Sequence, residues 1–271
     1  MEAAEFTDVL YDVDGPAAIV TINRPERYNA FRGRTVDELI AAFMRAWADD
    51  RVRSVILTGA GDKAFSSGGD VKQRAETGDY GPTESGVFEL ERFHRLIREI
   101  PKPVIAAVNG IAVGGGHVVQ VLCDLTIAAE HARFGQVGPR VGSFDGGFGS
   151  TYLTRVVGEK RAREIWYLCR QYDAATAERW GLANAVVPAD RLLEEAKTWA
   201  REIAEKSPTA IKFLKHAFNT DTEHQAGVTT LAMDALDLFL KTEESKEGAR
   251  AFTEKRPAAF TGYRDGQPVT G

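Results

Sequence analysis

Two glycine runs are the residues of this chain best suited to do chemistry: Ser66-Ser67-Gly68-Gly69-Asp70 and Gly114-Gly115-Gly116-His117. Each follows an apolar segment typical of a strand, Ser54–Thr58 for the first run and Val104–Val108 for the second. We therefore expect each run at a place where a strand ends and a helix begins, with backbone N–H groups free to face an anion. Two such donors that meet at one carbonyl oxygen would form an oxyanion hole.

Other glycine-loop motifs explain these runs less well. A dinucleotide fingerprint needs Gly-x-Gly-x-x-Gly, and the run that begins at Gly114 has Val119 where the last glycine would be. A phosphate loop needs Gly-Lys-Ser/Thr, which the chain lacks. The remaining alternative is that both runs are only tight turns.

Further motifs accompany the glycine runs along almost the whole chain, from about Phe6 to Phe260. They are Ile22-Asn23-Arg24-Pro25 with Asn29-Ala30-Phe31, Phe65–Asp70, Pro101-Lys102-Pro103 to Cys123-Asp124, and Phe134-Gly135-Gln136. This set resembles the crotonase (enoyl-CoA hydratase/isomerase) superfamily. The resemblance implies an α/β fold: a spiral core of repeated ββα units in residues 1–206, and a C-terminal helical trimerisation region in residues 207–271.

The resemblance also implies a coenzyme A thioester as substrate. Its enolate would be stabilised by the backbone amides of Gly69 and Gly115. Residues that would contact the coenzyme A part of the substrate map onto Arg27, Tyr28, Ser67, Gly68, Asp70, Ile111, Val113, Gly114 and Lys255. Lys255 would act from an adjacent subunit, since the family assembles into trimers or dimers of trimers. From the residues alone, Asp70 is a helix cap and Lys255 a solvated charge.

Hydration in this family requires two glutamates that act on water. The corresponding positions here hold Val118 and Gly138, and neither residue can transfer a proton. A plain enoyl-CoA hydratase is therefore disfavoured.

The segments Gln136–Gly147 and Arg163–Trp166 resemble the 1,4-dihydroxy-2-naphthoyl-CoA synthase subgroup, which closes a ring by a Dieckmann condensation in menaquinone synthesis. There a bicarbonate ion replaces a glutamate, at positions that correspond to Gln136, Gly138 and Trp166. We expect Ser143 and Asp145 to direct the fate of the enolate. The subgroup's tyrosine before its Thr-Glu-Glu is Leu240 here, and the loop over residues 72–85 is short but holds Tyr80.

Several alternatives remain open at this stage. Asn29–Gly33 and Phe218–Thr222 resemble the 2-ketocyclohexanecarboxyl-CoA hydrolase, which opens a ring. An enoyl-CoA hydratase/isomerase of other specificity and a noncatalytic acyl-CoA-binding scaffold are further alternatives. Asp145-Gly146 is also a turn signature, and Ser143 can bond within its own loop. His117, Gln136 and Trp166 are equally compatible with ordinary core or turn positions.

Composition limits the class of protein. The chain has 271 residues, 44% of them hydrophobic, which is enough for one large core. A net charge of −5 without basic runs argues against nucleic acid, and no apolar stretch reaches membrane length. Cys123 and Cys169 are isolated, so we expect neither a disulfide framework nor a metal site. We expect a cytoplasmic enzyme that needs no metal.

The elements that must position these residues can be outlined from sequence patterns. Asp8–Val13 and Ala18–Asn23 predict a hairpin, and Thr35 with Glu38 predicts a capping box. Apolar residues from Leu90 to Ile100 repeat at helical spacing until Pro101. After Pro208 we expect helices only, over Ile211–Phe218, Thr229–Lys241 and Lys246–Phe252.

Overall fold

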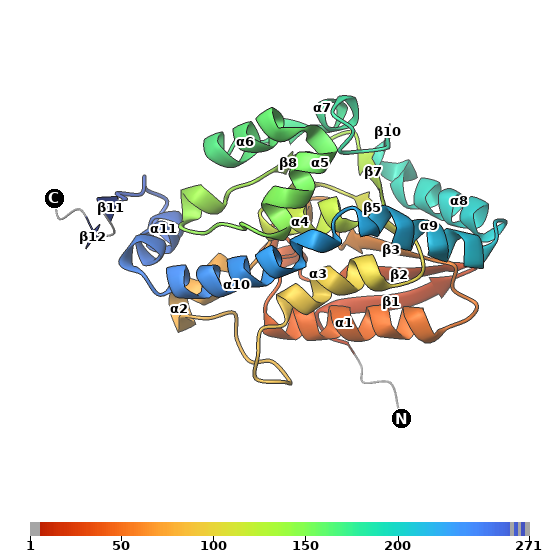
Figure 1. Cartoon of the computed structure of the whole chain (residues 1–271), viewed down its shortest axis with the longest axis horizontal. Coiled ribbons are helices and arrows are strands. Elements are labelled where there is room, and N and C mark those ends of the chain that lie inside the picture. The colour runs from red at the N-terminus through yellow and green to blue at the C-terminus, as the bar shows by residue number, and fades with distance from the viewer. Residues whose placement is uncertain (1–5, 261–262, 265–266, 269–271) are drawn as a thin grey trace.

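The computed structural model describes residues 6–260, 263–264 and 267–268. Its main sheet has six strands, and only β1 and β2 pair antiparallel while the others are parallel (Figure 1). In spatial order these strands are β1 (Val9–Asp14), β2 (Ala17–Ile22), β3 (Ser54–Gly59), β5 (Val104–Val108), β7 (Leu125–Ala129) and β10 (Ala185–Val187). The predicted hairpin is confirmed, and so are the two apolar strands ahead of the glycine runs.

A second, smaller sheet interleaves with the first along the chain. It contains β4 (Ala64–Ser66), β6 (Ile111–Val113), β8 (Arg133–Gly135) and β9 (Tyr172–Asp173). The chain passes from a main-sheet strand to a small-sheet strand and then to a helix, α2 (Val71–Thr77) after β4 and α4 (Gly115–Leu122) after β6. This repetition confirms the predicted α/β spiral of ββα units. One detail differs, because the glycine runs follow the short strands β4 and β6 and not the long strands before them.

The two faces of the main sheet are buried in separate apolar clusters. Val55 and Leu57 of β3 face one cluster, while Ile56 between them faces the other, as the alternation of a strand requires. Helix α1 (Gly33–Ala48) covers the first face and α8 (Leu192–Ala204) the second. Burial on both faces explains why these strands are apolar throughout.

Helix α1 begins earlier than the sequence predicts. Its first residue is Gly33, so Thr35 lies inside the first turn and its hydroxyl accepts from the Arg32 N–H. The carboxylate of Glu38 accepts instead from the N–H groups of residues 7–9 ahead of β1. The predicted Thr35–Glu38 capping box is therefore wrong, because Glu38 has tertiary partners.

The remaining helices and turns surround this core. They are η1 (Pro25–Arg27), α3 (Leu90–Glu99), η2 (Gly138–Val141), a π-helical turn η3 (Phe148–Tyr152), α5 (Leu153–Val157), α6 (Glu159–Leu168), α7 (Ala174–Arg179) and η4 (Ala189–Arg191). Helix α3 confirms the predicted helix before Pro101. None of the helices in the described part of the chain is both long and apolar enough to cross a membrane.

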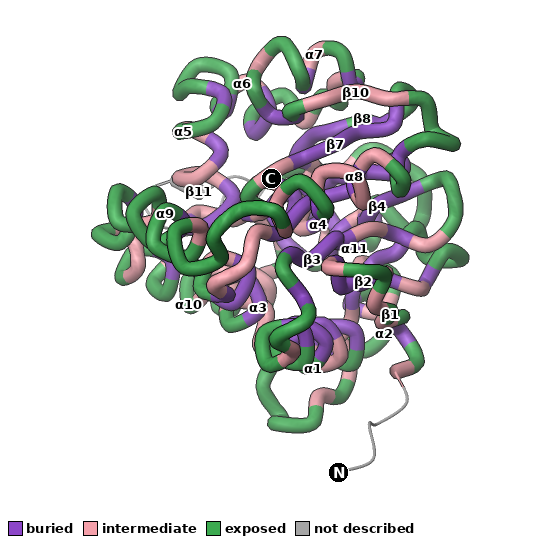
Figure 2. Tube along the Cα trace, turned by 90° about the vertical axis from the view of Figure 1, so that its right-hand side faces the viewer, coloured by how far each residue is buried: buried purple, intermediate pink, exposed green. Residues whose placement is uncertain are grey.

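After Pro208 the chain forms α9 (Pro208–Thr220), η5 (Glu223–Gln225), α10 (Ala226–Leu240) and α11 (Glu243–Thr253). The expectation of helices only is wrong in one detail, since β11 (Tyr263–Arg264) pairs antiparallel with β12 (Gln267–Pro268). Buried and partly buried contacts of Lys215 and Arg95 fasten this region to the core. Lys215 Nζ donates to Ile97 O and lies 2.7 Å from Asp124 Oδ2, and Arg95 donates to Ala226 O. The outer faces of α9 and α10 remain exposed (Figure 2).

Candidate active site

The first glycine run is held by the segment before α1. Phe31 N donates to Gly68 O at 2.8 Å, and Asp70 N donates to Phe31 O at 3.0 Å. Ser67 N also donates to Tyr28 O. This segment therefore backs the glycine run through an isolated parallel bridge between Phe31 and Gly69, and the N–H of Gly69 faces away from it.

The two glycine runs touch each other. A Cβ placed on Gly68 would lie 2.6 Å from Gly115 N, and one placed on Gly115 would lie 3.4 Å from Gly68 Cα. A Gly115 Cβ would also lie 2.6 Å from Phe31 Cζ, so only glycine permits this contact. Among the described residues, the N–H groups of Gly69 and Gly115 find no acceptor. Two free donors thus lie on adjacent loops, which is the arrangement that an oxyanion hole needs.

Both runs border a cavity of about 870 Å³. Its wall is completed by α3, by the turn after β8 and by α10 of the same chain. Nine of the residues predicted from sequence line it: Ser67, Gly69, Gly114, Gly115, Gln136, Gly138, Ser143, Asp145 and Trp166. The fold therefore collects these residues from distant segments in one cavity.

Asp145 is a partly buried carboxylate in this wall. Its Oδ1 accepts from Gly149 N at 2.8 Å and from Gly147 N at 3.0 Å, at the start of the π-helical turn. No described residue donates to Oδ2. Burial raises the pKa of this carboxyl above its usual value, and the two backbone N–H donors oppose that rise. Asp145 is therefore a fixed group with one oxygen available for proton transfer.

Comparison with known proteins identifies the family to which the chain belongs. The family model for enoyl-CoA hydratase/isomerase matches residues 14–264. The chain belongs to this family, the crotonase superfamily. A solved enoyl-CoA hydratase from Mycobacterium avium subsp. paratuberculosis K-10 is similar, with a TM-score of 0.84 and 28% identity over 95% of this chain and all of that one. A solved carnitinyl-CoA hydratase from Mycobacterium avium is also similar, with a TM-score of 0.83 and 31% identity over 93% of this chain and 98% of that one.

A solved enoyl-CoA hydratase/isomerase from Xanthobacter autotrophicus Py2 is 34% identical, with a TM-score of 0.78 over 92% of this chain and 93% of that one. These findings confirm the predicted crotonase fold and its helical C-terminal region. As a crotonase the protein is an enzyme of acyl-CoA thioesters. The similar structures are named as hydratases, and the resemblance to naphthoate synthase stays a prediction.

In this crotonase both expected glutamate positions of a hydratase face the cavity, but as Val118 and Gly138. Position 138 also has little room. A Cβ there would lie 2.8 Å from Ser143 O and 3.2 Å from Cζ3 of Trp166. A carboxylate at this position would require the backbone around Ser143 to move.

Gln136 and Trp166 are already engaged within the chain. The amide Nε2 of Gln136 lies 2.9 Å from Nδ1 of His117, while Gln136 Oε1 is buried without a partner in the described chain. Trp166 Nε1 donates to Gly149 O at 2.9 Å, so its ring rather than its N–H faces Gly138. Burial lowers the pKa of His117 to about 3, which keeps the imidazole neutral.

Seven residues expected at the substrate lie outside the cavity lining: Arg27, Tyr28, Gly68, Asp70, Ile111, Val113 and Lys255. Arg27 and Tyr28 contact Ser67, which does line the cavity. The Ser67 N–H donates to Tyr28 O, and the Ser67 hydroxyl donates to Arg27 O. Asp70 is the helix cap expected from the residues alone, since Oδ1 accepts from Gln73 N and Oδ2 pairs with Arg24 at 3.0 Å. Contacts of Arg27, Tyr28 and Lys255 with coenzyme A stay predictions.

The structure adds residues that sequence reasoning missed or left undecided. Tyr80 covers the first glycine run, since a Cβ on Gly69 would lie 2.6 Å from its ring. Residues 72–77 of the expected loop over residues 72–85 belong to helix α2, and Arg74 of α2 lines the cavity. His94 of α3 lines it too. A polar residue on the buried face of a helix was the only sequence signal for His94.

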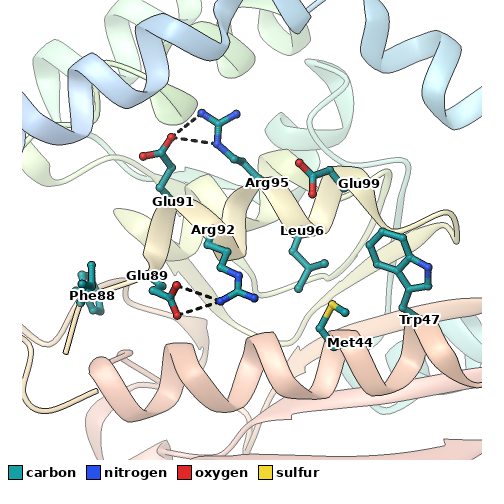
Figure 3. A pocket seen from close by; sticks show the side chains of 10 residues that line it. Met44, Trp47, Phe88, Glu89, Glu91, Arg92, Arg95, Leu96 and Glu99 are labelled. Carbon is teal, nitrogen blue, oxygen red and sulfur yellow. Dashed lines mark hydrogen bonds and ion pairs between the residues drawn. The ribbon is translucent and has the colours of Figure 1, made fainter. Parts of the chain in front are cut away.

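A second hollow lies on the surface between α1 and α3 (Figure 3). It shares only Phe88 with the cavity. Four of its five charges neutralise one another, because Glu91 pairs with Arg95 and Glu89 with Arg92, while Glu99 adds one further negative charge. No group of three potential metal-binding side chains occurs in the described part of the chain. The cavity between the glycine runs and Asp145 is therefore the candidate active site.

Proposed function

We propose that this crotonase moves protons on an enoyl-CoA thioester, as an isomerase or hydratase of distinct specificity, with Asp145 as acid and base. The observation that carries the proposal is the carboxylate of Asp145, which is partly buried in the same cavity as the free N–H groups of Gly69 and Gly115, whereas the other lining carboxylates, Asp79 and Asp237, are exposed. The names of similar solved structures support it.

In this mechanism the carboxylate of Asp145 removes a proton from carbon, and the electron pair moves onto the thioester oxygen. The N–H groups of Gly69 and Gly115 stabilise the resulting enolate in a site that excludes water. Asp145, now protonated, returns the proton to another carbon, and the double bond moves. One carboxylate is enough for this reaction, whereas hydration also requires an activated water.

Carbon–carbon chemistry of the Dieckmann type is the second candidate. It is favoured by the replacement of both hydratase glutamates by Val118 and Gly138. In this case the naphthoate synthase resemblance supports an external base, and a bicarbonate ion beside Gln136 would remove the proton. The unpartnered Oε1 of Gln136 could accept a hydrogen bond from the O–H of such an ion. Asp145 and Ser143 would then orient the second carbonyl, and a ring-opening hydrolase would use the reverse step.

The substitution Asp145→Asn separates the two candidates, since it removes the charge and keeps the shape. In the first candidate, turnover and solvent deuterium exchange at the α carbon of a saturated acyl-CoA fall together, by about 10²- to 10⁴-fold. Continued exchange without turnover would instead favour the Dieckmann candidate, as would activation by bicarbonate. Tight binding of acyl-CoA thioesters without turnover or exchange in the unaltered protein would favour the noncatalytic scaffold.

We also propose that the protein assembles as a trimer or a dimer of trimers through α9 and α10. Large apolar side chains stand exposed there: Phe213, Leu214, Phe218, Leu231 and Leu238. Such a cluster is typical of a surface that binds another protein chain. Lys255 would reach the coenzyme A phosphates of an adjacent subunit in this assembly.

A further inference from the structure

His94 is buried in a place where its polar atoms find no partner. The side chain has 1% of its surface exposed, and neither Nδ1 nor Nε2 has a hydrogen-bond partner in the described chain. A neutral imidazole carries one donor and one acceptor, and leaving them unpaired away from water is costly. An unpaired side chain of this kind needs an explanation.

Helix α3 aims this side chain at the cavity. Leu90 and His94 are four residues apart, so they share one face of the helix, and both line the cavity. The neighbouring face, with Arg92, Leu96 and Glu99, borders the outer hollow (Figure 3). The ring of Phe148 meets His94 edge-on, with centroids 5.0 Å apart. His94 is therefore a polar side chain among apolar neighbours.

Apart from Oε1 of Gln136, the polar groups that the proposed chemistry uses already have partners in the chain or belong to the thioester. Asp145 is held by Gly147 and Gly149, and the free N–H groups belong to Gly69 and Gly115. The nucleotide part of coenzyme A is charged and must remain near solvent. A side chain with 1% exposure is therefore remote from the nucleotide, and we assign it to the acyl part.

We propose that His94 forms a hydrogen bond with an oxygen-bearing group, a hydroxyl or a carbonyl, on the acyl part of the substrate and thereby sets the acyl specificity. The inference rests on the proposed acyl-CoA function of the cavity. Burial keeps the pKa of His94 near 3, so the ring stays neutral and can both donate and accept. A neutral ring offers no charge to pair with a buried carboxylate, so the site favours a neutral hydroxyl or carbonyl.

The test is binding, measured by calorimetry, of benzoyl-CoA and its 2-, 3- and 4-hydroxy derivatives. We expect the intact protein to prefer one hydroxylated isomer over benzoyl-CoA by about 5- to 150-fold. His94→Leu removes this preference and leaves benzoyl-CoA binding unchanged or tighter. His94→Gln retains a donor and an acceptor, so it keeps part of the preference.

Two controls make the result interpretable. His131→Leu changes an exposed histidine outside the cavity, so the preference should persist. The melting temperature without ligand should rise in His94→Leu, because an unpaired polar group is removed. If His94→Leu fails to fold, His94→Phe and His94→Gln carry the comparison.

The inference is overturned if the intact protein binds all four thioesters equally, or if the preference persists in both His94→Leu and His94→Phe. In those cases the acyl-CoA function itself still stands. If the intact protein binds no thioester, the proposed function fails together with the inference, and the two failures are therefore distinguishable.

Discussion

At the scale of single residues, the burial of Asp145 has a consequence for stability. The raised pKa means that the folded protein keeps a proton which the unfolded chain, with an ordinary pKa near 3.8, has already lost. Stability therefore falls as pH rises through this interval. At pH 7 the buried charge carries its full cost, so Asp145→Asn should raise the melting temperature on the order of a few degrees.

The rise in melting temperature caused by Asp145→Asn should shrink toward zero near pH 3, because the wild-type carboxyl is protonated there and carries no charge either. Asp173→Asn is a suitable control, because contacts with Thr176 lower the pKa of that carboxyl. It should give no rise at pH 7. Scanning calorimetry of the three proteins at both pH values measures this. An equal shift at pH 3 and pH 7 would contradict the assignment of the effect to charge.

Gly115 gives a second prediction at this scale. Gly115→Ala places a Cβ against the Phe31 ring and displaces an oxyanion donor, so kcat should fall by about 100-fold while the fold persists. Gly227→Ala is the matched control, since a Cβ on this exposed helical glycine meets no atom within 4 Å. Steady-state kinetics and circular dichroism distinguish the two. Normal turnover of folded Gly115→Ala would show that this N–H does not act in catalysis.

At the scale of elements, a buried ion pair sets the start of α2. Arg24 and Asp70 lie 3.0 Å apart with side chains 8% and 5% exposed, next to the first glycine run. Asp70→Ala removes the nearer of the two carboxylates that face the buried Arg24 guanidinium, leaving Asp8 at 3.7 Å, and it also removes the helix cap. It should lower the free energy of unfolding by up to about 3–5 kcal/mol. Denaturant titration measures this loss.

Glu159→Ala provides the comparison for Asp70→Ala. It removes an ion pair with Arg163 in which both side chains are more than half exposed, so the unfolding midpoint should barely move. Equal effects of the two substitutions would mean that burial does not decide the strength of the Arg24–Asp70 pair.

Sequence patterns predicted the elements whose signals are local. The strand Val104–Val108 is bounded as expected, because a strand buried on both faces is apolar throughout. The strands Ala64–Ser66 and Ile111–Val113 escaped prediction, since three residues are too few to show a period. His94 could not be recognised either, because the absence of a partner is a property of tertiary packing.

At the scale of the whole molecule, the exposed face of α9 should control assembly. Phe213 and Phe218 are 63% and 77% exposed in the single chain. Replacing both by Asp should convert the expected trimer or hexamer to monomers, measured by light scattering after gel filtration, with little change in melting temperature. Thr209→Asp, at an exposed position in the first turn of α9, should leave the assembly intact.

The attachment of α9 and α10 to their own core also bears on whether the active sites of an assembly depend on one another. Lys215 and Arg95 hold these helices in place, and α10 closes the cavity of the chain to which it belongs, with Met233, Leu236 and Leu240. In a subunit that carries Asp145→Asn, only that subunit's own site would therefore lose activity, and the sites of its neighbours would stay active. Mixed assemblies should lose activity in proportion to the defective fraction, and the defect should be recessive rather than dominant-negative.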